Sequence, residues 1–394
     1  MTLPLSGMRI LDLTANLAGP FSTQILADFG AEVHKVEDIR GGDPSRLNPP
    51  LIGDEGANFF IVNRNKKSLA LNFHSDEGKE LFKDMAAKCD VVVDSFRPGY
   101  MEKLGLDYEV LRQINPRLIY CSMTAYGQDG PLANSASHDV NILSLAGITG
   151  LTGDGDTPPQ LTGAQLGGLA GGSLNAVIAI LLAVIHRDKT GQGQFCDVSM
   201  LDGSFAFLCN ALGFQAGFGD SVEWGTRVFT GRTAFYNIYQ TKDGGYLSLG
   251  AIEHKFWKIF CDKIGRPDYL EKHWDGDNQE EMKREIADLM LTRTRDEWLQ
   301  EFVGLDICLT PVMALNEVCE QPWVKERDMV FSIPNFRESG KELRVTGQPI
   351  KLSETPAEVK LVFPRLGEHG NEILSILGYT HEDIVKLREQ GIIG

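Results

Sequence analysis

The segment Asp94-Ser95-Phe96-Arg97-Pro98-Gly99 combines a cation with an aromatic ring at a place suited to ligand binding. It follows an apolar run, so Arg97 is predicted at the carboxyl end of a strand, with Lys103 about one turn into the next helix. A guanidinium can stack on an adenine ring and pair with a phosphate, and Phe96 can supply a second apolar wall. The alternative is a surface arginine at a strand-loop junction. The residues alone do not decide between the two.

A second stretch suited to close contact with a ligand is the glycine-dense segment 147–172. Glycines leave backbone N–H groups accessible and give a ligand room to approach. The runs GDGDT (153–157) and GQG (191–193) lack the spacing of phosphate-binding loops, so turns are the preferred interpretation. The seven cysteines are scattered, and no His/Cys group has the spacing of zinc ligands, so neither a metal site nor a disulfide framework is predicted.

The elements that position these segments alternate between strand and helix. Helices are predicted at 21–29 and 76–88, and strands at 8–13, 31–37, 68–73, 90–96 and 117–124. This alternation predicts an α/β fold with a Rossmann-like parallel sheet, which binds ligands beyond the carboxyl ends of its strands. A buried apolar helix is predicted at 173–187, after the glycine-dense segment.

A chain of 394 residues is too long for one ordinary core, so two domains are predicted. The smaller one is expected to be α+β, with a strand pair around Asp243 and a charged helical stretch at 278–298. The predicted division is a large domain at 1–200, a linker at 201–224, the small domain at 225–315, and a segment at 316–394 that links back to the large domain.

The charge balance excludes some classes of partner. Lys and Arg number 38 against 54 Asp and Glu, a net charge of -16, which argues against nucleic acid and against an anionic membrane surface. The N-terminus lacks the basic start and long apolar run of a signal peptide, and the longest apolar run, 176–185, is too short to cross a bilayer. We expect a soluble, cytoplasmic protein with no nucleic-acid or membrane partner.

Long segments of the chain resemble the family III CoA-transferases. They are LSGMRILDLTANLAGPFSTQILADFGAEVHKVE, NRNKKSLALNF, VVVDSFRPGYMEKLGLDYEVLRQINPRLIYCSMTAYGQDGP, TGQGQFCDVSMLDGS and YQTKDGGYLSLGAIEHKFW, in this order. The family includes carnitine and formyl-CoA transferases and the α-methylacyl-CoA racemases. Its members are intertwined dimers, in which each chain threads a ring formed by the other chain's two domains. The resemblance implies this fold, with CoA or acyl-CoA and a carboxylic acid as substrates.

Carried over residue by residue, the resemblance puts CoA against Asn16, Leu17 and Ala18 in the loop Asn16–Pro20 and against Phe73. It also puts CoA against Ser95, Phe96 and Arg97, with Lys103 near the phosphates. One departure is Asn65, which stands in NRNKK where the family often has glycine. That change is expected to alter cofactor contacts without abolishing them.

The departure with the largest consequence is Gly168. Family transferases use an Asp at the start of the long helix, in a pattern like ADLAGGSL, whereas this chain reads QLGGLAGGS from Gln165 to Ser173. The family's carboxylate attacks the thioester, forms a mixed anhydride and turns over through an enzyme–CoA thioester, which glycine cannot do. Gln165 is not a nucleophile, and Asp154 and Asp156 lie upstream, so a displaced substitute is disfavoured.

The racemase branch of the family implies a different set of residues. Ser137-His138-Asp-Val-Asn resembles the racemase histidine motif, and LGAIEHKF supplies Glu253. The racemase Asp, however, also falls on Gly168, so a two-base epimerisation lacks one base. A purely structural role for His138 is an equal alternative.

The preferred interpretation is a CoA-transferase subunit without its own nucleophile, paired with a homologous chain that carries the Asp. It would move CoA between an acyl-CoA, such as succinyl-CoA, and a carboxylic acid. The two-subunit succinyl-CoA:benzylsuccinate CoA-transferases of anaerobic toluene degradation are a precedent. The alternatives are a homodimeric acyl-CoA epimerase or isomerase that uses His138 and Glu253, and a non-catalytic CoA-binding protein.

Overall fold

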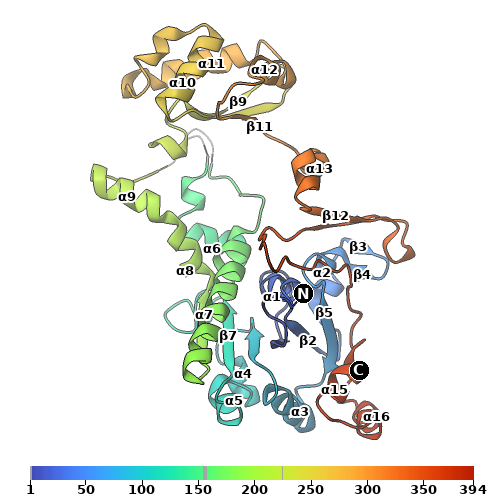
Figure 1. Cartoon of the computed structure of the whole chain (residues 1–394). Helices are drawn as coiled ribbons and strands as arrows, with labels where there is room; N and C mark the ends of the chain where they lie inside the picture. Colours follow the sequence, from blue (N-terminus) through green and yellow to red (C-terminus); the bar gives the residue numbers. More distant parts are fainter. Residues whose placement is uncertain (1, 154–157, 224) are drawn as a thin grey trace. The chain divides into compact units, whose positions relative to one another are not determined.

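The computed structural model describes residues 2–153, 158–223 and 225–394. The chain forms two compact units (Figure 1). Unit 1 consists of Met1–Ala146, Gly163–Phe207 and Pro322–Gly394, and unit 2 of Gly147–Thr162 and Leu208–Gln321.

Unit 1 is built on a six-stranded sheet in the order β5-β2-β1-β6-β7-β8, and all neighbouring strands run parallel (Figure 1). The parallel α/β architecture predicted from the sequence is therefore confirmed. The strand at Phe195–Ser199 was not predicted, because its edge position leaves much of it exposed and its apolar pattern is weak. The strands are β1 (Arg9–Asp12), β2 (Glu32–Asp38), β5 (Lys66–Leu71), β6 (Val91–Asp94), β7 (Ile119–Thr124) and β8 (Phe195–Ser199).

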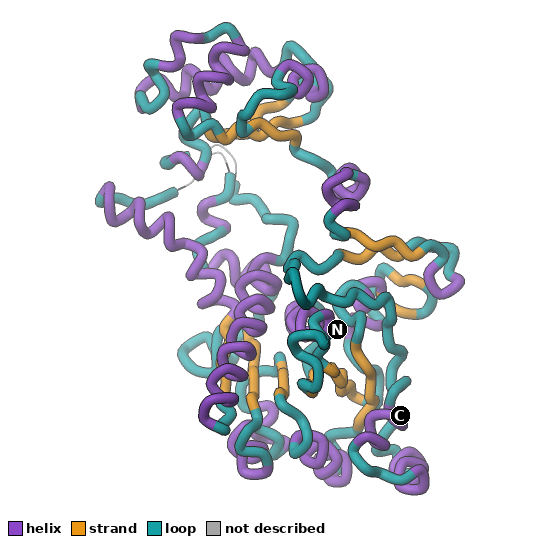
Figure 2. The backbone as a smooth tube through the Cα atoms, viewed as in Figure 1, coloured by secondary structure: helices purple, strands orange, loops and turns teal. Residues whose placement is uncertain are grey.

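Helices cover both faces of this sheet (Figure 2). Successive strand residues point to opposite faces, so Ile10 packs in one apolar cluster and Leu11 in the other. The Ile10 face is covered by α1 (Ala18–Asp28) and α7 (Asn175–Thr190). The Leu11 face is covered by α3 (Asp76–Ala86), α5 (Tyr108–Ile114), α15 (Gly370–Ile376) and α16 (His381–Glu389).

The strand order reverses between β1 and β6. The chain runs outward from β1 through β2 to β5, and then resumes at β6 and runs the other way through β7 to β8. The loops that follow β1 and β6 therefore diverge at the carboxyl edge of the sheet. In open parallel sheets this is where a ligand crevice forms.

The apolar helix after the glycine-dense segment is longer than predicted. It begins as a π-helical stretch, η3 (Gly167–Leu174), and continues without a break as α7. Together they form a helix of 24 residues that contains an 18-residue window with a mean hydropathy of 2.2, long and apolar enough by composition to cross a membrane. Part of it is a core helix, because Ala176, Ile180 and Ala183 pack in the same cluster as the sheet residues.

Unit 2 has its own core, around Trp257. Its three-stranded antiparallel sheet has the order β11-β10-β9 and contains the predicted strand pair, β9 (Tyr236–Gln240) and β10 (Tyr246–Gly250), with β11 (Leu309–Pro311) added at one edge. Its main helices are α10 (His254–Ile264), α11 (Gln279–Met290) and α12 (Arg295–Glu301).

The remaining segments carry short elements. The stretch 201–224, predicted as a linker, contains most of α8 (Met200–Phe205) and all of α9 (Cys209–Phe218). The domain boundaries drawn from the sequence stay a prediction. The other helices are α2 (Ala57–Phe60), α4 (Tyr100–Leu104), α6 (Asp139–Leu145), α13 (Leu315–Glu320) and α14 (Pro322–Glu326), and the other strands are β3 (Leu51–Ile52), β4 (Glu55–Gly56), β12 (Val330–Ile333) and β13 (Leu343–Thr346).

Candidate active site

A cavity of about 390 Å³ lies in unit 1 where the strand order reverses. Its walls come from the loops after β1 and β6, the end of β7, the start of α6 and the start of η3. The structure thus brings together in one cavity most of the residues singled out in the sequence: Asn16, Leu17, Ala18, Ser95, Phe96, Arg97, His138 and Gly168.

The loop after β6 is held in place by buried hydrogen bonds. The Phe96 N–H donates to Asp94 Oδ1 at 2.9 Å, and the Ser122 hydroxyl donates to the same oxygen at 3.1 Å. The Ala15 N–H donates to the Ser95 hydroxyl oxygen at 3.3 Å, which ties the loops after β1 and β6 together. The backbone at Ser95 and Phe96 is therefore held from both sides of the crevice.

Arg97 extends from this fixed corner to the surface. Its side chain is exposed, and its guanidinium has no hydrogen bond or ion pair with any residue that the structure describes. It lies between two cavities, because it also lines a second one of about 630 Å³ that contains Asp94, Tyr120 and Phe195. An unpaired cation beside two cavities is free to meet an anionic ligand.

The Asp94 carboxyl beneath this corner is buried, with 3% of its surface exposed. Burial raises its pKa from 3.8 to about 6, against the opposing hydrogen bonds from the Phe96 N–H and the Ser122 hydroxyl. The folded protein therefore holds this proton more tightly than the unfolded chain does. Stability attributable to Asp94 falls as the pH rises from about 4 to about 6.

We expect Asp94→Asn to stabilise the protein at pH 7 by about 1–3 kcal/mol, because it avoids ionising a buried carboxyl while its oxygen can still accept from the Phe96 N–H. Urea unfolding of both proteins from pH 4 to pH 7 measures this. The difference in unfolding free energy should grow between about pH 4 and about pH 6 and level off above it. A variant less stable than the wild type at pH 7 would contradict the prediction.

Gly168 is the second residue of η3, and it faces the cavity. Its N–H donates to Asp139 Oδ1 at 2.8 Å. A carboxylate of the chain itself therefore already occupies this amide at the start of the helix. A Cβ built on Gly168 would lie 3.4 Å from the Ala18 Cβ and 3.7 Å from Asp139 Oδ1, both ordinary contact distances. The position can accept a side chain.

Asp139 is the residue that sequence reasoning missed. It is the first residue of α6, half-buried, and it lines the cavity beside Gly168. The sequence offered one signal, since Asp139 directly follows His138 in the segment that resembles the racemase motif. Asp139 lies 29 residues before Gly168 in the sequence, and only the folded chain shows that its carboxylate contacts Gly168.

His138 and Gln165 also line the cavity. His138 is exposed and precedes α6, and its backbone N–H donates to Asn141 Oδ1 at 3.0 Å. The candidate carboxylate Glu253 is exposed in unit 2, where it precedes α10. A catalytic role for His138 and Glu253 stays a prediction.

The remaining predicted residues lie away from the cavity walls. Phe73 is only 5% exposed and packs in the core on the Leu11 face of the sheet. Lys103 is exposed in the last turn of α4. Asp154 and Asp156 lie outside the described residues. Among the residues that the structure does describe, no group of three or more His, Cys, Asp or Glu could hold a metal ion.

Comparison with known proteins gives a consistent result along the whole chain. The family model described as CoA-transferase family III matches residues 5–370. The chain is 35% identical to succinyl-CoA:glutarate CoA-transferase of Mus musculus, over 99% of this chain and 90% of that protein. It is 36% identical to succinyl-CoA:mesaconate CoA-transferase of Haloarcula hispanica, over 95% and 96% of the two chains. It is 34% identical to alpha-methylacyl-CoA racemase of Mus musculus, over 99% and 97%.

Solved structures show the same architecture. A CAIB/BAIF family protein from Brucella suis superimposes with a TM-score of 0.81 at 30% identity, covering 96% of this chain and all of that one. Rv3272 from Mycobacterium tuberculosis superimposes with a TM-score of 0.79 at 31% identity, covering 94% of this chain and 98% of that one.

Proposed function

Because the chain belongs to CoA-transferase family III, we propose that it is an acyl-CoA-binding subunit whose own catalytic carboxylate is replaced by Gly168. The family assignment supports an enzyme of the CoA-transferase type, acting on an acyl-CoA and a carboxylic acid. The observation that carries the finer proposal is Gly168 itself, a glycine that faces the cavity among the predicted CoA-binding residues.

The cavity suits the thioester end of an acyl-CoA. At about 390 Å³ it falls within the size of small-molecule sites, which run from about 300 to 1,000 Å³, and is too small for a whole CoA molecule. The nucleotide end is therefore proposed to pass the Phe96–Arg97 corner, where the unpaired guanidinium of Arg97 can meet a phosphate. Lys103, which follows Arg97 in the sequence and is exposed on α4, supplies a second cation for the phosphates.

Covalent transfer needs a carboxylate that this position lacks. In the proposed enzyme, the carboxylate of a homologous chain attacks the thioester carbon, and the CoA thiolate leaves. The thiolate then attacks the enzyme's carbonyl in the mixed anhydride, which releases the first acid and leaves CoA bound to the enzyme as a thioester. The acceptor acid takes CoA by the reverse sequence. No other reactant is needed. The cavity at Gly168 binds acyl-CoA without forming a covalent bond to it.

An exposed apolar stripe on the η3–α7 helix supports pairing with a second chain. Its members recur at intervals of four, four and three residues, so they share one helix face. They are Leu174 (46% exposed), Ile178 (53%), Leu182 (60%) and Ile185 (52%). A row of large apolar side chains in water is a feature of surfaces that are covered by a partner. We propose that the homologous chain covers it in the intertwined, ring-like dimer of the family.

We expect the chain, expressed alone, to bind CoA and yet accumulate no enzyme–CoA thioester when incubated with succinyl-CoA. Borohydride reduction or hydroxylamine trapping followed by peptide mass spectrometry measures this. With a homologous chain that carries Asp at the corresponding position, the thioester should appear on that chain only. A thioester trapped on Asp139 of this chain would contradict the proposal, because it would make Asp139 a substitute nucleophile.

The second candidate is an acyl-CoA epimerase or isomerase. The 34% identity to a racemase and the presence of His138 and Asp139 in one cavity favour it. Deuterium uptake at the acyl α-carbon in D₂O, lost on His138→Ala, would support this alternative over CoA transfer. Tight CoA binding with neither activity would indicate a non-catalytic CoA-binding protein. Benzylsuccinate as the acceptor acid and the cytoplasm as the location remain parts of the proposal.

A further inference from the structure

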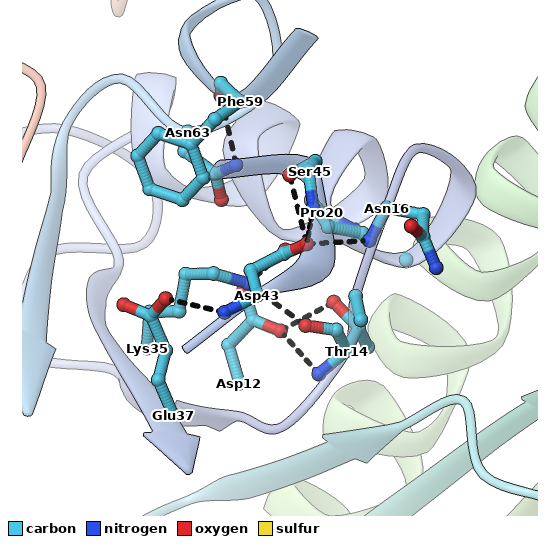
Figure 3. A network of polar contacts seen from close by, with 12 residues as sticks. Asp12, Thr14, Asn16, Pro20, Lys35, Glu37, Asp43, Ser45, Phe59 and Asn63 are labelled. Carbon is cyan, nitrogen blue, oxygen red and sulfur yellow. Dashed lines mark hydrogen bonds and ion pairs between the residues drawn. The ribbon is translucent and has the colours of Figure 1, made fainter. Parts of the chain in front are cut away.

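A buried ionic network lies directly behind the loop that follows β1 (Figure 3). Lys35 of β2 pairs with Asp43 at 3.0 Å, with side-chain exposures of 0% and 1%. Lys66 of β5 pairs with Asp12 of β1 at 2.9 Å, and both side chains have 0% exposure. Four ionised groups in the interior are a costly arrangement, because each one loses its hydration.

One pair holds the loop on both sides of Ala15. The Lys35 ammonium donates to the Thr14 carbonyl oxygen at 2.8 Å, and the Asn16 N–H donates to Asp43 Oδ1 at 3.0 Å. Figure 3 shows Lys35, Asp43, Thr14 and Asn16 converging in this way. Asp43 is itself fixed, because its Oδ1 accepts from the Ser45 N–H at 2.9 Å and from the Ser45 hydroxyl at 2.8 Å.

The other pair fixes the two ends of the same segment. Asp12 Oδ1 accepts from the Thr14 N–H at 2.9 Å. The Lys66 ammonium donates to the Pro20 carbonyl oxygen at 2.8 Å, in the first turn of α1. Buried charged groups thus hold the segment from the end of β1 to the start of α1 at three residues, Thr14, Asn16 and Pro20.

Asn16 needs such support, because its φ of 66° lies in the left-handed region that non-glycine residues seldom adopt. Buried ion pairs contribute little net stability compared with apolar side chains of the same size. Their use here is better explained by the geometry they impose on Asn16, Leu17 and Ala18, which line the cavity.

We propose that Asp43 and Lys35 are positioning residues for ligand binding: they hold the Asn16–Ala18 loop in its binding conformation before CoA arrives. The inference rests on the proposed function in one respect, that CoA contacts this loop. Neither side chain lines the cavity, so both act through the backbone of Thr14 and Asn16.

Asp43→Ala removes the acceptor of the Asn16 N–H, and we expect CoA affinity measured by calorimetry to fall about tenfold. Asp43→Asn keeps that acceptor and should recover part of the affinity. Asp28→Ala is the matched control, because Asp28 is equally buried and pairs with Arg64 at 2.7 Å, at the far end of α1 from the loop. It should lower the melting temperature without changing the dissociation constant. Equal losses of affinity in Asp43→Ala and Asp28→Ala would overturn the proposal.

Amide hydrogen exchange on the wild-type protein tests the same idea without a ligand or a variant. The Asn16 amide should be protected as strongly as the amides of the core strand β6, because its acceptor is buried. Exchange at the rate of an open loop would overturn the proposal even if Asp43→Ala fails to fold. If the wild type binds no CoA but the Asn16 amide is protected, the proposed function fails and the positioning network stands.

Discussion

Arg97→Ala is expected to weaken CoA binding at least tenfold without lowering the melting temperature. The guanidinium is exposed and makes no contact with the described residues that its removal would break, so stability should not change. A charge-assisted hydrogen bond to a phosphate contributes about 1.5–3 kcal/mol, and about 1.4 kcal/mol already corresponds to a tenfold change in the dissociation constant. Isothermal titration calorimetry with CoA measures the effect.

Arg112→Ala is the matched control for this measurement. Arg112 is also a partly exposed arginine of unit 1, with 47% of its side chain accessible, but it pairs with Glu109 at 3.0 Å and lines neither cavity beside Arg97. Its loss should leave CoA affinity unchanged. A second test uses dephospho-CoA, which lacks the 3′-phosphate. If Arg97→Ala binds CoA as tightly as the wild type does, the nucleotide end does not pass this corner, and the proposed CoA path is wrong.

The sheet and its crevice could be predicted from the sequence because their signals are local. In an alternating pattern of strands and helices, an apolar run such as Val91–Val93 is expected to form a buried strand of a parallel sheet. The loop that follows β6 must then lie at the carboxyl edge of that sheet. Edge strand β8 escaped prediction because an exposed edge needs no continuous apolar run. Local periodicity carries no information about how far burial extends across the sheet.

The polar interior of the site could not be predicted, because it depends on pairs of residues far apart in the chain. The local sequences of β2 and β5 do not show on which face of the sheet Lys35 and Lys66 lie. In the structure both lysines are fully buried, and each pairs with a buried carboxylate from another part of the chain. Asp139 and Gly168 illustrate the same limit. Resemblance identified the empty position, but only the fold shows which carboxylate now contacts it.

That contact sets the expected result of Gly168→Asp, the substitution that restores the family's nucleophile. The side chain fits, because its Cβ would meet only ordinary contacts with Ala18 and Asp139. The new carboxylate, however, would lie beside that of Asp139, and two carboxylates at such a distance raise the pKa of one of them. A protonated or displaced carboxyl is a poor nucleophile, so we expect transferase turnover about a hundredfold below that of a native site.

The double variant Gly168→Asp/Asp139→Asn is expected to turn over faster than Gly168→Asp alone, because the asparagine oxygen can still accept from the residue 168 N–H while the second negative charge is gone. Succinyl-CoA and a panel of carboxylic acids, with transfer followed by mass spectrometry, measure both. Gly168→Ala is the control, since it adds the Cβ without a carboxylate and should bind CoA but remain inactive. If both Asp-bearing variants fold, bind CoA and still fail to transfer it, more than the nucleophile has been lost, and the chain's role narrows to that of a binding partner.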